Sequence, residues 1–123
     1  LLDLMFIKDE AIVMTAGQGL AKAEKMLEVL AGVEAEREEN FESLQRLVRS
    51  YRDEFSACLC VFPGWTPERA EFVQGLARSG LQMICMVVCR DRVATEALME
   101  QDPVPCRRLI LETGSIQTQL MAL

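Results

Sequence analysis

The middle of the chain contains two apolar runs with one helical segment between them. Ala57–Phe62 and Gln82–Cys89 are almost entirely apolar, which is typical of strands covered on both faces in a parallel sheet. Between them, Thr66-Pro67-Glu68 supplies an N-cap, a proline at the first helical position and an early acid. Gly80 fits the position just after a helix. The sequence therefore predicts two adjacent parallel strands joined by a helix over residues 67–79, with a right-handed crossover.

The segments before this unit predict a hairpin and two helices. Apolar residues 4–7 and 11–14 flank the polar residues 8–10, as in two short antiparallel strands. Apolar residues then recur at helical spacing from Leu20 to Glu34. Asn40 is a good N-cap for a second helix, which we expect to run to about Glu54.

The segments after the unit predict a helix over residues 93–101, a strand over 107–111 and a short helix after Gly114-Ser115. This order indicates an α/β fold with an open, mostly parallel sheet, helices on both faces and an N-terminal hairpin. We expect residues 1–123 to form a single, partial domain. The chain opens on Leu1-Leu2-Asp3, which is not a signal-peptide pattern, and we expect it to be cut from a longer protein.

Composition excludes several classes of function. Half of the residues are hydrophobic, 26% are charged and the net charge is −6. An acidic domain lacks the clustered Lys and Arg that nucleic-acid binding and docking on anionic lipid require. No apolar stretch reaches the length of a membrane helix.

The cysteines and the lack of histidine restrict the chemistry further. The chain has five cysteines and no histidine, so Ser–His and Cys–His nucleophiles and His-containing metal sites are excluded. Four cysteines lie in apolar runs and are expected to be reduced core residues in the cytoplasm. Cys58 and Cys60 would share one face of a strand, but without the two cysteine pairs of a zinc site. Cys106, beside Arg107 and Arg108, is the one candidate for a reactive thiol.

Three other segments carry weak functional signals. Gly17-Gln18-Gly19 precedes a helix but lacks the phosphate-loop pattern, so we interpret it as a turn. The acidic residues between Glu34 and Glu39 are interpreted as a solvated segment. Trp65, the only tryptophan, follows a predicted strand, where ligands of open α/β sheets bind. It is either a contact residue or a cover for the start of the helix.

The apolar pattern resembles the later part of a von Willebrand factor A-like domain. The resemblance covers residues 4–88, most closely residues 19–33, with a weaker continuation to residue 123. Within this fold class the chain is similar to the bacterial family called domain of unknown function fifty-eight. The resemblance implies association with MoxR-type AAA+ ATPases.

Domains of this fold often bind a divalent ion through an Asp-x-Ser-x-Ser motif, a Thr and an Asp. The resemblance implies that the motif is absent here, that the Thr position falls near Asn40, and that the Asp position falls near Pro63-Gly64. Mg²⁺ prefers carboxylate oxygens and water. We therefore predict no metal and no other cofactor. The resemblance also implies a missing central strand, and hence an exposed sheet edge.

We therefore expect a protein-interaction module that is not an enzyme, whose partner is a protein such as an AAA+ ATPase. The expected interaction loop comprises Asn40, Pro63, Gly64, Trp65 and Thr66. We also expect a homodimer that covers the open sheet edge or its apolar faces, unless the opening hairpin fills the gap within one chain. The alternative function is a small-molecule-binding or enzymatic α/β domain with a site near Gly64-Trp65-Thr66. A response-regulator-like domain would need an acid where Pro63-Gly64 stands.

Overall fold

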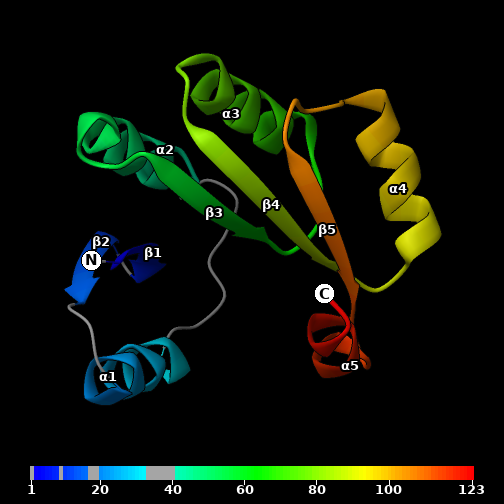
Figure 1. Ribbon diagram of the computed structural model, residues 1–123. Coiled ribbons are helices and arrows are strands. Elements are labelled where there is room, and N and C mark those ends of the chain that lie inside the picture. The colour runs from blue at the N-terminus through cyan, green and yellow to red at the C-terminus, as the bar shows by residue number, and fades with distance from the viewer. Residues whose placement is uncertain (1, 9, 17–19, 33–40) are drawn as a thin grey trace. The chain divides into compact units, whose positions relative to one another are not determined.

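The structure is a computed structural model that describes residues 2–8, 10–16, 20–32 and 41–123. The chain divides into two compact units, Leu1–Glu54 and Phe55–Leu123, and Figure 1 shows the elements of each. The interpretations placed on residues 17–19, on the acidic segment and on Asn40 lie outside the described residues. The single partial domain stays a prediction.

The first unit contains the predicted hairpin and two helices. β1 (Leu2–Lys8) pairs antiparallel with β2 (Glu10–Ala16), which confirms the hairpin and lengthens both strands. In α1 (Leu20–Ala31), Met26 is buried among the side chains that the structure describes. α2 (Phe41–Ser50) contacts β1 and β2 and buries Val48.

The second predicted helix is shorter than the sequence indicates. It ends at Ser50 rather than near Glu54, and Arg52–Glu54 form a separate 3-10 turn. The Ser50 hydroxyl donates a hydrogen bond of 2.7 Å to the Leu47 carbonyl oxygen. Serine side chains that bond to the nearby backbone in this way compete with helix continuation.

The second unit is a parallel α/β unit, as the apolar runs predict. Its strands β3 (Ala57–Phe62), β4 (Gln82–Cys89) and β5 (Arg107–Glu112) lie in the order β3-β4-β5 and are parallel throughout. α3 (Pro67–Arg78) and α4 (Arg92–Gln101) connect them, and α5 (Ile116–Met121) follows β5. The predicted boundaries are confirmed to within two residues in this unit.

Local signals explain where α3 and α4 begin. The Thr66 hydroxyl oxygen accepts from the backbone N–H of Arg69 at 3.2 Å, and Asp91 Oδ1 accepts from the N–H of Ala94 at 3.1 Å. Both are N-cap contacts that satisfy an otherwise unpaired helical amide. Gly80 follows α3 with φ of +91°, a conformation that glycine adopts without strain.

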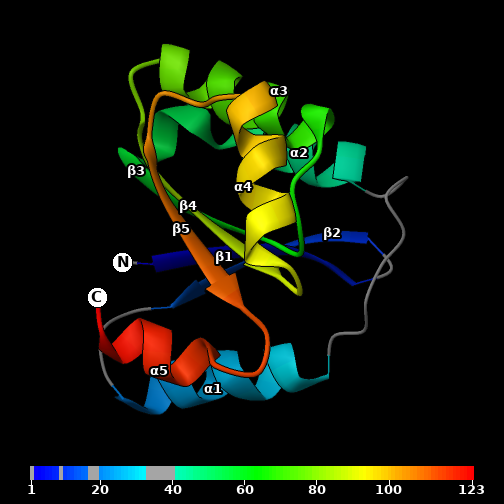
Figure 2. The same ribbon diagram turned by 90° about the vertical axis from the view of Figure 1, so that its right-hand side faces the viewer.

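The two faces of the sheet differ. Figures 1 and 2 show α3 and α4 on the same side of it. Toward these helices the central strand presents its odd-numbered residues, and Cys85 and Val87 are completely buried. The helices contribute Val73 and Met99, at most 1% exposed, to this core. The second helix layer, on the other face, stays a prediction.

Candidate functional site

A cavity of about 530 Å³ lies where the three parallel strands end. Its walls come from the loop after β3, the first turn of α3, the end of β4, two residues of α4 and the residue after β5. The lining residues are Pro63, Gly64, Trp65, Thr66, Arg69, Val88, Cys89, Arg90, Thr95, Leu98 and Thr113. The Thr113 N–H donates to the Cys89 carbonyl oxygen at 2.8 Å, which holds the ends of β5 and β4 together. This is the edge of an open α/β sheet at which ligands bind.

The loop after β3 folds back so that Trp65 is buried. Gly64 has φ of +118°, which a residue with a side chain rarely adopts. Trp65 is only 5% exposed, and its ring meets Phe62 edge-on with 6.1 Å between ring centroids. Trp65 Nε1 is buried, and among the described residues it has no hydrogen-bond acceptor. Buried indole N–H groups normally have a partner.

Arg69 brings a positive charge into the same wall. Although charged, it is only 9% exposed. Its guanidinium carbon lies 5.8 Å from the centroid of the Phe62 ring, within the range of a cation–π contact. A Cβ built on Gly64 would come within 3.6 Å of Arg69 Nη1, so the guanidinium lies directly beside the loop.

The structure brings together four of the five residues of the predicted interaction loop. Pro63, Gly64, Trp65 and Thr66 all line the cavity, whereas Asn40 lies outside the described residues. Sequence reasoning missed Arg69, Arg90, Thr95 and Thr113. Two of these could have been found, because Arg90 and Thr113 directly follow strands whose carboxyl ends must meet at one edge.

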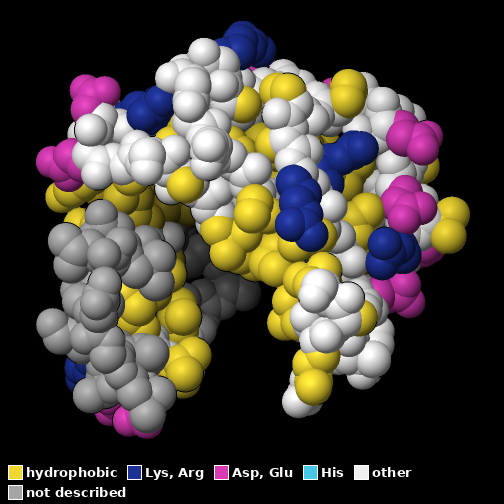
Figure 3. Space-filling model, in the orientation of Figure 1, with side chains coloured by type: hydrophobic (Ala, Val, Ile, Leu, Met, Phe, Trp, Pro, Cys, Tyr) yellow, Lys and Arg dark blue, Asp and Glu magenta, His cyan; other side chains and the backbone are white. Residues whose placement is uncertain are grey.

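A second candidate surface is the face of the sheet away from α3 and α4, here called the open face. It comprises Leu59, Val61, Ile84, Met86 and Leu109, with Arg107 at one end. The register places Leu59, Ile84 and Arg107 in one row and the remaining three in the next. Leu59 is 57% exposed, Val61 60% and Ile84 37%. Figure 3 shows hydrophobic side chains gathered over these strands.

The cysteines are free thiols with different acidities. Cys58 and Cys60 share a strand face, with 3.7 Å between their sulfur atoms. This hydrogen bond lowers the pKa of Cys58, while the same bond and burial raise the pKa of Cys60. Burial raises the pKa of Cys85 to about 12.

Cys106 does not have the environment expected of a reactive thiol. Burial raises its pKa, and the opposing effect of the Arg108 charge is the smaller one. A thiol reacts as its thiolate, so the arginines beside Cys106 do not activate it. The sequence interpretation of this residue as the candidate reactive thiol is therefore not supported by its environment.

Within the described part of the chain, no group of three or more His, Cys, Asp or Glu side chains could hold a metal ion. In that same part, no helix has both the length and the apolar character needed to cross a bilayer. No protein-family model, curated protein or solved structure matches the chain. The resemblance to von Willebrand factor A-like domains, and what it implies about metal, therefore stay predictions.

Proposed function

We propose that the chain is a non-catalytic protein-interaction module and that the open face is its docking surface. The observation that supports this is the exposure of Leu59, Val61 and Ile84 on two neighbouring strands of one sheet. Parallel sheets are ordinarily covered on both faces, and contiguous exposed apolar patches mark interaction sites. α3 and α4 cover one face and leave the other to a further element.

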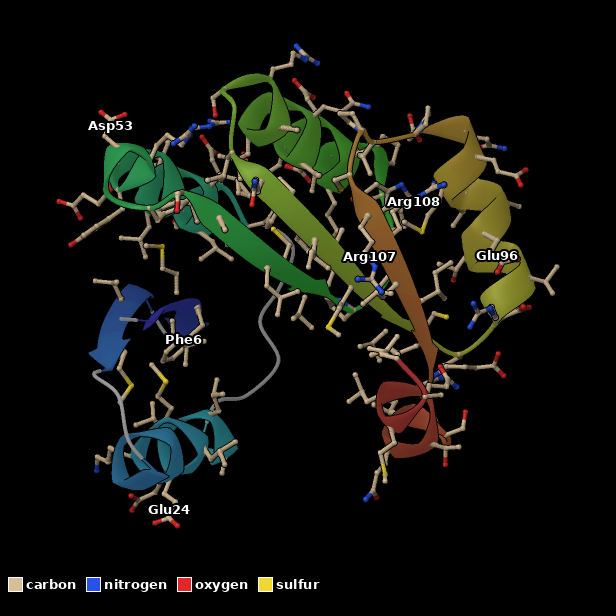
Figure 4. The ribbon with its side chains drawn as sticks, in the orientation of Figure 1. Phe6, Glu24, Asp53, Glu96, Arg107 and Arg108 are labelled. Atoms are coloured by element: carbon tan, nitrogen blue, oxygen red, sulfur yellow. The ribbon has the colours of Figure 1, made fainter. Side chains whose placement is uncertain are left out.

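The element that fits this face is an amphipathic helix, because helices are what cover parallel sheets. Arg107 ends the row of Leu59 and Ile84, so the helix should carry a carboxylate at a matching position. α1 has these properties, with Leu27 66% and Leu30 39% exposed and Glu24 one turn before Leu27. Figure 4 labels Glu24 and Arg107. We commit to a second copy of the chain as the occupant, in a two-fold homodimer.

Sedimentation equilibrium tests the homodimer directly. The wild-type protein should reach twice its 13.8 kDa mass at micromolar concentration and dissociate on dilution. Leu59→Asp should raise the dissociation constant about thirtyfold or more, the effect of losing a residue that contributes about 2 kcal/mol to an interface. The matched control is Val93→Asp, because Val93 is 77% exposed on α4 and lies outside the open face.

Charge reversal tests the orientation of the docked helix. Arg107→Glu and Glu24→Lys should each weaken the dimer, and the double variant should recover part of the loss, since close charge pairs are coupled. A wild-type monomer at every concentration would refute the homodimer. An equal effect of Leu59→Asp and Val93→Asp would refute the open face as its docking surface.

The resemblance described above supports two extensions of the proposal. One is that the second unit is the later part of a von Willebrand factor A-like fold. The other is that a MoxR-type AAA+ ATPase is a further protein partner, in the cytoplasm, where cysteines stay reduced. A purified ATPase of this type should bind the wild-type chain in a calorimetric titration and should bind Leu59→Asp more weakly. No binding to either would refute this partner.

A further inference from the structure

We infer that Cys58, Cys60 and Met83 form a sulfur site that binds one Cu(I) ion on the helix-covered face of the sheet. The site lies on the opposite side of β3 and β4 from the open face, so the proposed interaction function does not depend on it. A copper site departs from the sequence-based prediction of no metal only for soft ions, because the predicted lack of a Mg²⁺ site concerns oxygen ligands.

Four sulfur-bearing side chains occupy two neighbouring rows of this face. The parallel register places Cys58 beside Met83 and Cys60 beside Cys85. Residues two apart in a strand point to the same face, and neighbouring strands lie about 5 Å apart. Cys60, Met83 and Cys85 are buried, whereas Cys58 is half-buried. The sulfur atoms therefore gather in one small part of the core, which is open to solvent at Cys58.

The two thiols of β3 are spaced for a shared ion. Cys58 Sγ and Cys60 Sγ are 3.7 Å apart. Metal–thiolate bonds in proteins are about 2.3 Å long, so one ion can bridge two sulfur atoms up to about 4.6 Å apart. The hydrogen bond between the thiols lowers the pKa of Cys58, which makes its proton the easier one to displace. Binding releases one proton from each thiol and transfers no electron, because copper enters and stays as Cu(I).

The types of ligand select Cu(I). Thiolate and thioether sulfur atoms together favour Cu(I), whereas structural zinc sites take four Cys or His ligands. Among the residues that the structure describes, no group of three or more His, Cys, Asp or Glu could hold a metal ion. The thioether of Met83, beside Cys58 in the register, therefore supplies the third ligand. A set of two thiolates and a thioether suits Cu(I) and does not suit zinc.

Arg108 balances the charge of the loaded site. Two thiolates and one Cu(I) ion together are negatively charged, and a buried charge needs a partner. Arg108 continues the row of Cys60 and Cys85 onto β5. Its Nη1 donates to the Met99 carbonyl oxygen at 3.5 Å, which places the guanidinium on the α4 side of the sheet. Burial raises the pKa of Cys85 and the Arg108 charge opposes that effect, so the same charge stabilises nearby thiolates.

Competition with bicinchoninate, a chelator that is coloured when it holds Cu(I), tests the site on the reduced chain without oxygen. The wild-type protein should withdraw one equivalent of Cu(I) from the chelator, and its ultraviolet thiolate-to-copper absorption should saturate at the same point. X-ray absorption at the copper edge should show sulfur neighbours only. Failure to take up one equivalent would overturn the inference, as would nitrogen or oxygen neighbours.

Serine variants on the two strands separate the site from binding by any thiol. Cys58→Ser should weaken Cu(I) binding about hundredfold or more, because loss of an outer-shell partner alone costs roughly 10- to 100-fold. The matched control is Cys89→Ser, which removes a buried thiol at the far end of β4 and should leave the affinity unchanged. Wild-type affinity in folded Cys58→Ser, or an equal loss in Cys89→Ser, would overturn the assignment.

Leucine variants of β4 cover the case in which circular dichroism shows that Cys58→Ser does not fold. Met83→Leu nearly keeps the side-chain volume but removes the thioether, so it should fold and weaken Cu(I) binding about tenfold, the lower end of the range for altered metal surroundings. Met86→Leu makes the same change on the open face of the same strand and should have no effect. Equal affinities of the two leucine variants would show that the assigned ligand set is wrong.

Discussion

Val87→Thr tests which face of the central strand forms the core of the second unit. Val87, in β4, is 0% exposed and lies on the side of α3 and α4. Threonine has nearly the shape of valine and a similar preference for strands, so the change mainly replaces a buried methyl group by a hydroxyl group. Backbone hydrogen bonds in β4 are already used by β3 and β5.

The expected cost is roughly 2–4 kcal/mol of the free energy of unfolding. About 0.8 kcal/mol comes from the lost burial of one methyl group, and roughly 1–3 kcal/mol comes from a buried hydroxyl group without a partner. The matched control is Val61→Thr on the open face, where the side chain is 60% exposed. Its cost should stay within about 0.5 kcal/mol.

Urea unfolding followed by Trp65 fluorescence measures both variants, because Trp65 is buried in the same unit. The protein should be kept at a concentration at which sedimentation shows only monomer, so that any effect on association is excluded. Equal costs for the two variants would mean that both faces are buried in the monomer. A cost near zero for Val87→Thr would mean that the assigned core face is wrong.

Three further predictions follow from the caps, the thiols and the absent ligand motif. Thr66→Ala should lower the free energy of unfolding by about 1 kcal/mol through loss of the N-cap bond, measured by urea unfolding, whereas the exposed Thr118→Ala in α5 should change it little. Alkylation followed by mass spectrometry should modify Cys58 at lower pH than Cys85, because a lowered pKa leaves more thiolate at a given pH. Cys60→Ser should move the Cys58 profile toward higher pH by weakening the hydrogen bond, and an unchanged profile would contradict that cause. Calorimetric titration with Mg²⁺ or Mn²⁺ should show no saturable heat, and a stoichiometric micromolar site would contradict this.

The fold of the second unit could largely be predicted because its signals are local. Ala57–Phe62 was predicted with the observed boundaries, since an apolar run followed by Pro63-Gly64 leaves little choice of where the strand ends. Thr66 and Pro67 determined where α3 begins, through a side-chain cap and a fixed φ. The end of α2 was misplaced, because the apolar spacing continues through Tyr51 and Phe55 although the helix stops at Ser50.

The candidate site could be predicted only in part. The sequence identified Pro63–Thr66 as a loop at a strand end, and general knowledge of α/β sheets made it a candidate ligand site. Arg69 was missed because a charged residue in the first turn of a helix is usually solvated, and nothing local shows that it packs against Phe62. Its burial depends on the positive φ at Gly64 and on the direction in which the loop turns.

The sequence by itself determined the order of elements, the parallel α/β class and the lack of histidine chemistry. These depend on residue types and on spacing within a few positions. Only the tertiary structure decided which strand face is buried. Leu59 and Cys60 both belong to an apolar run in the sequence, but neighbouring residues of a strand point to opposite faces of the sheet, and Leu59 is exposed while Cys60 is buried. The tertiary structure also decided where the cavity lies. The strand ends Phe62, Cys89 and Glu112 are far apart in the chain and meet at one edge only when β3, β4 and β5 align in parallel.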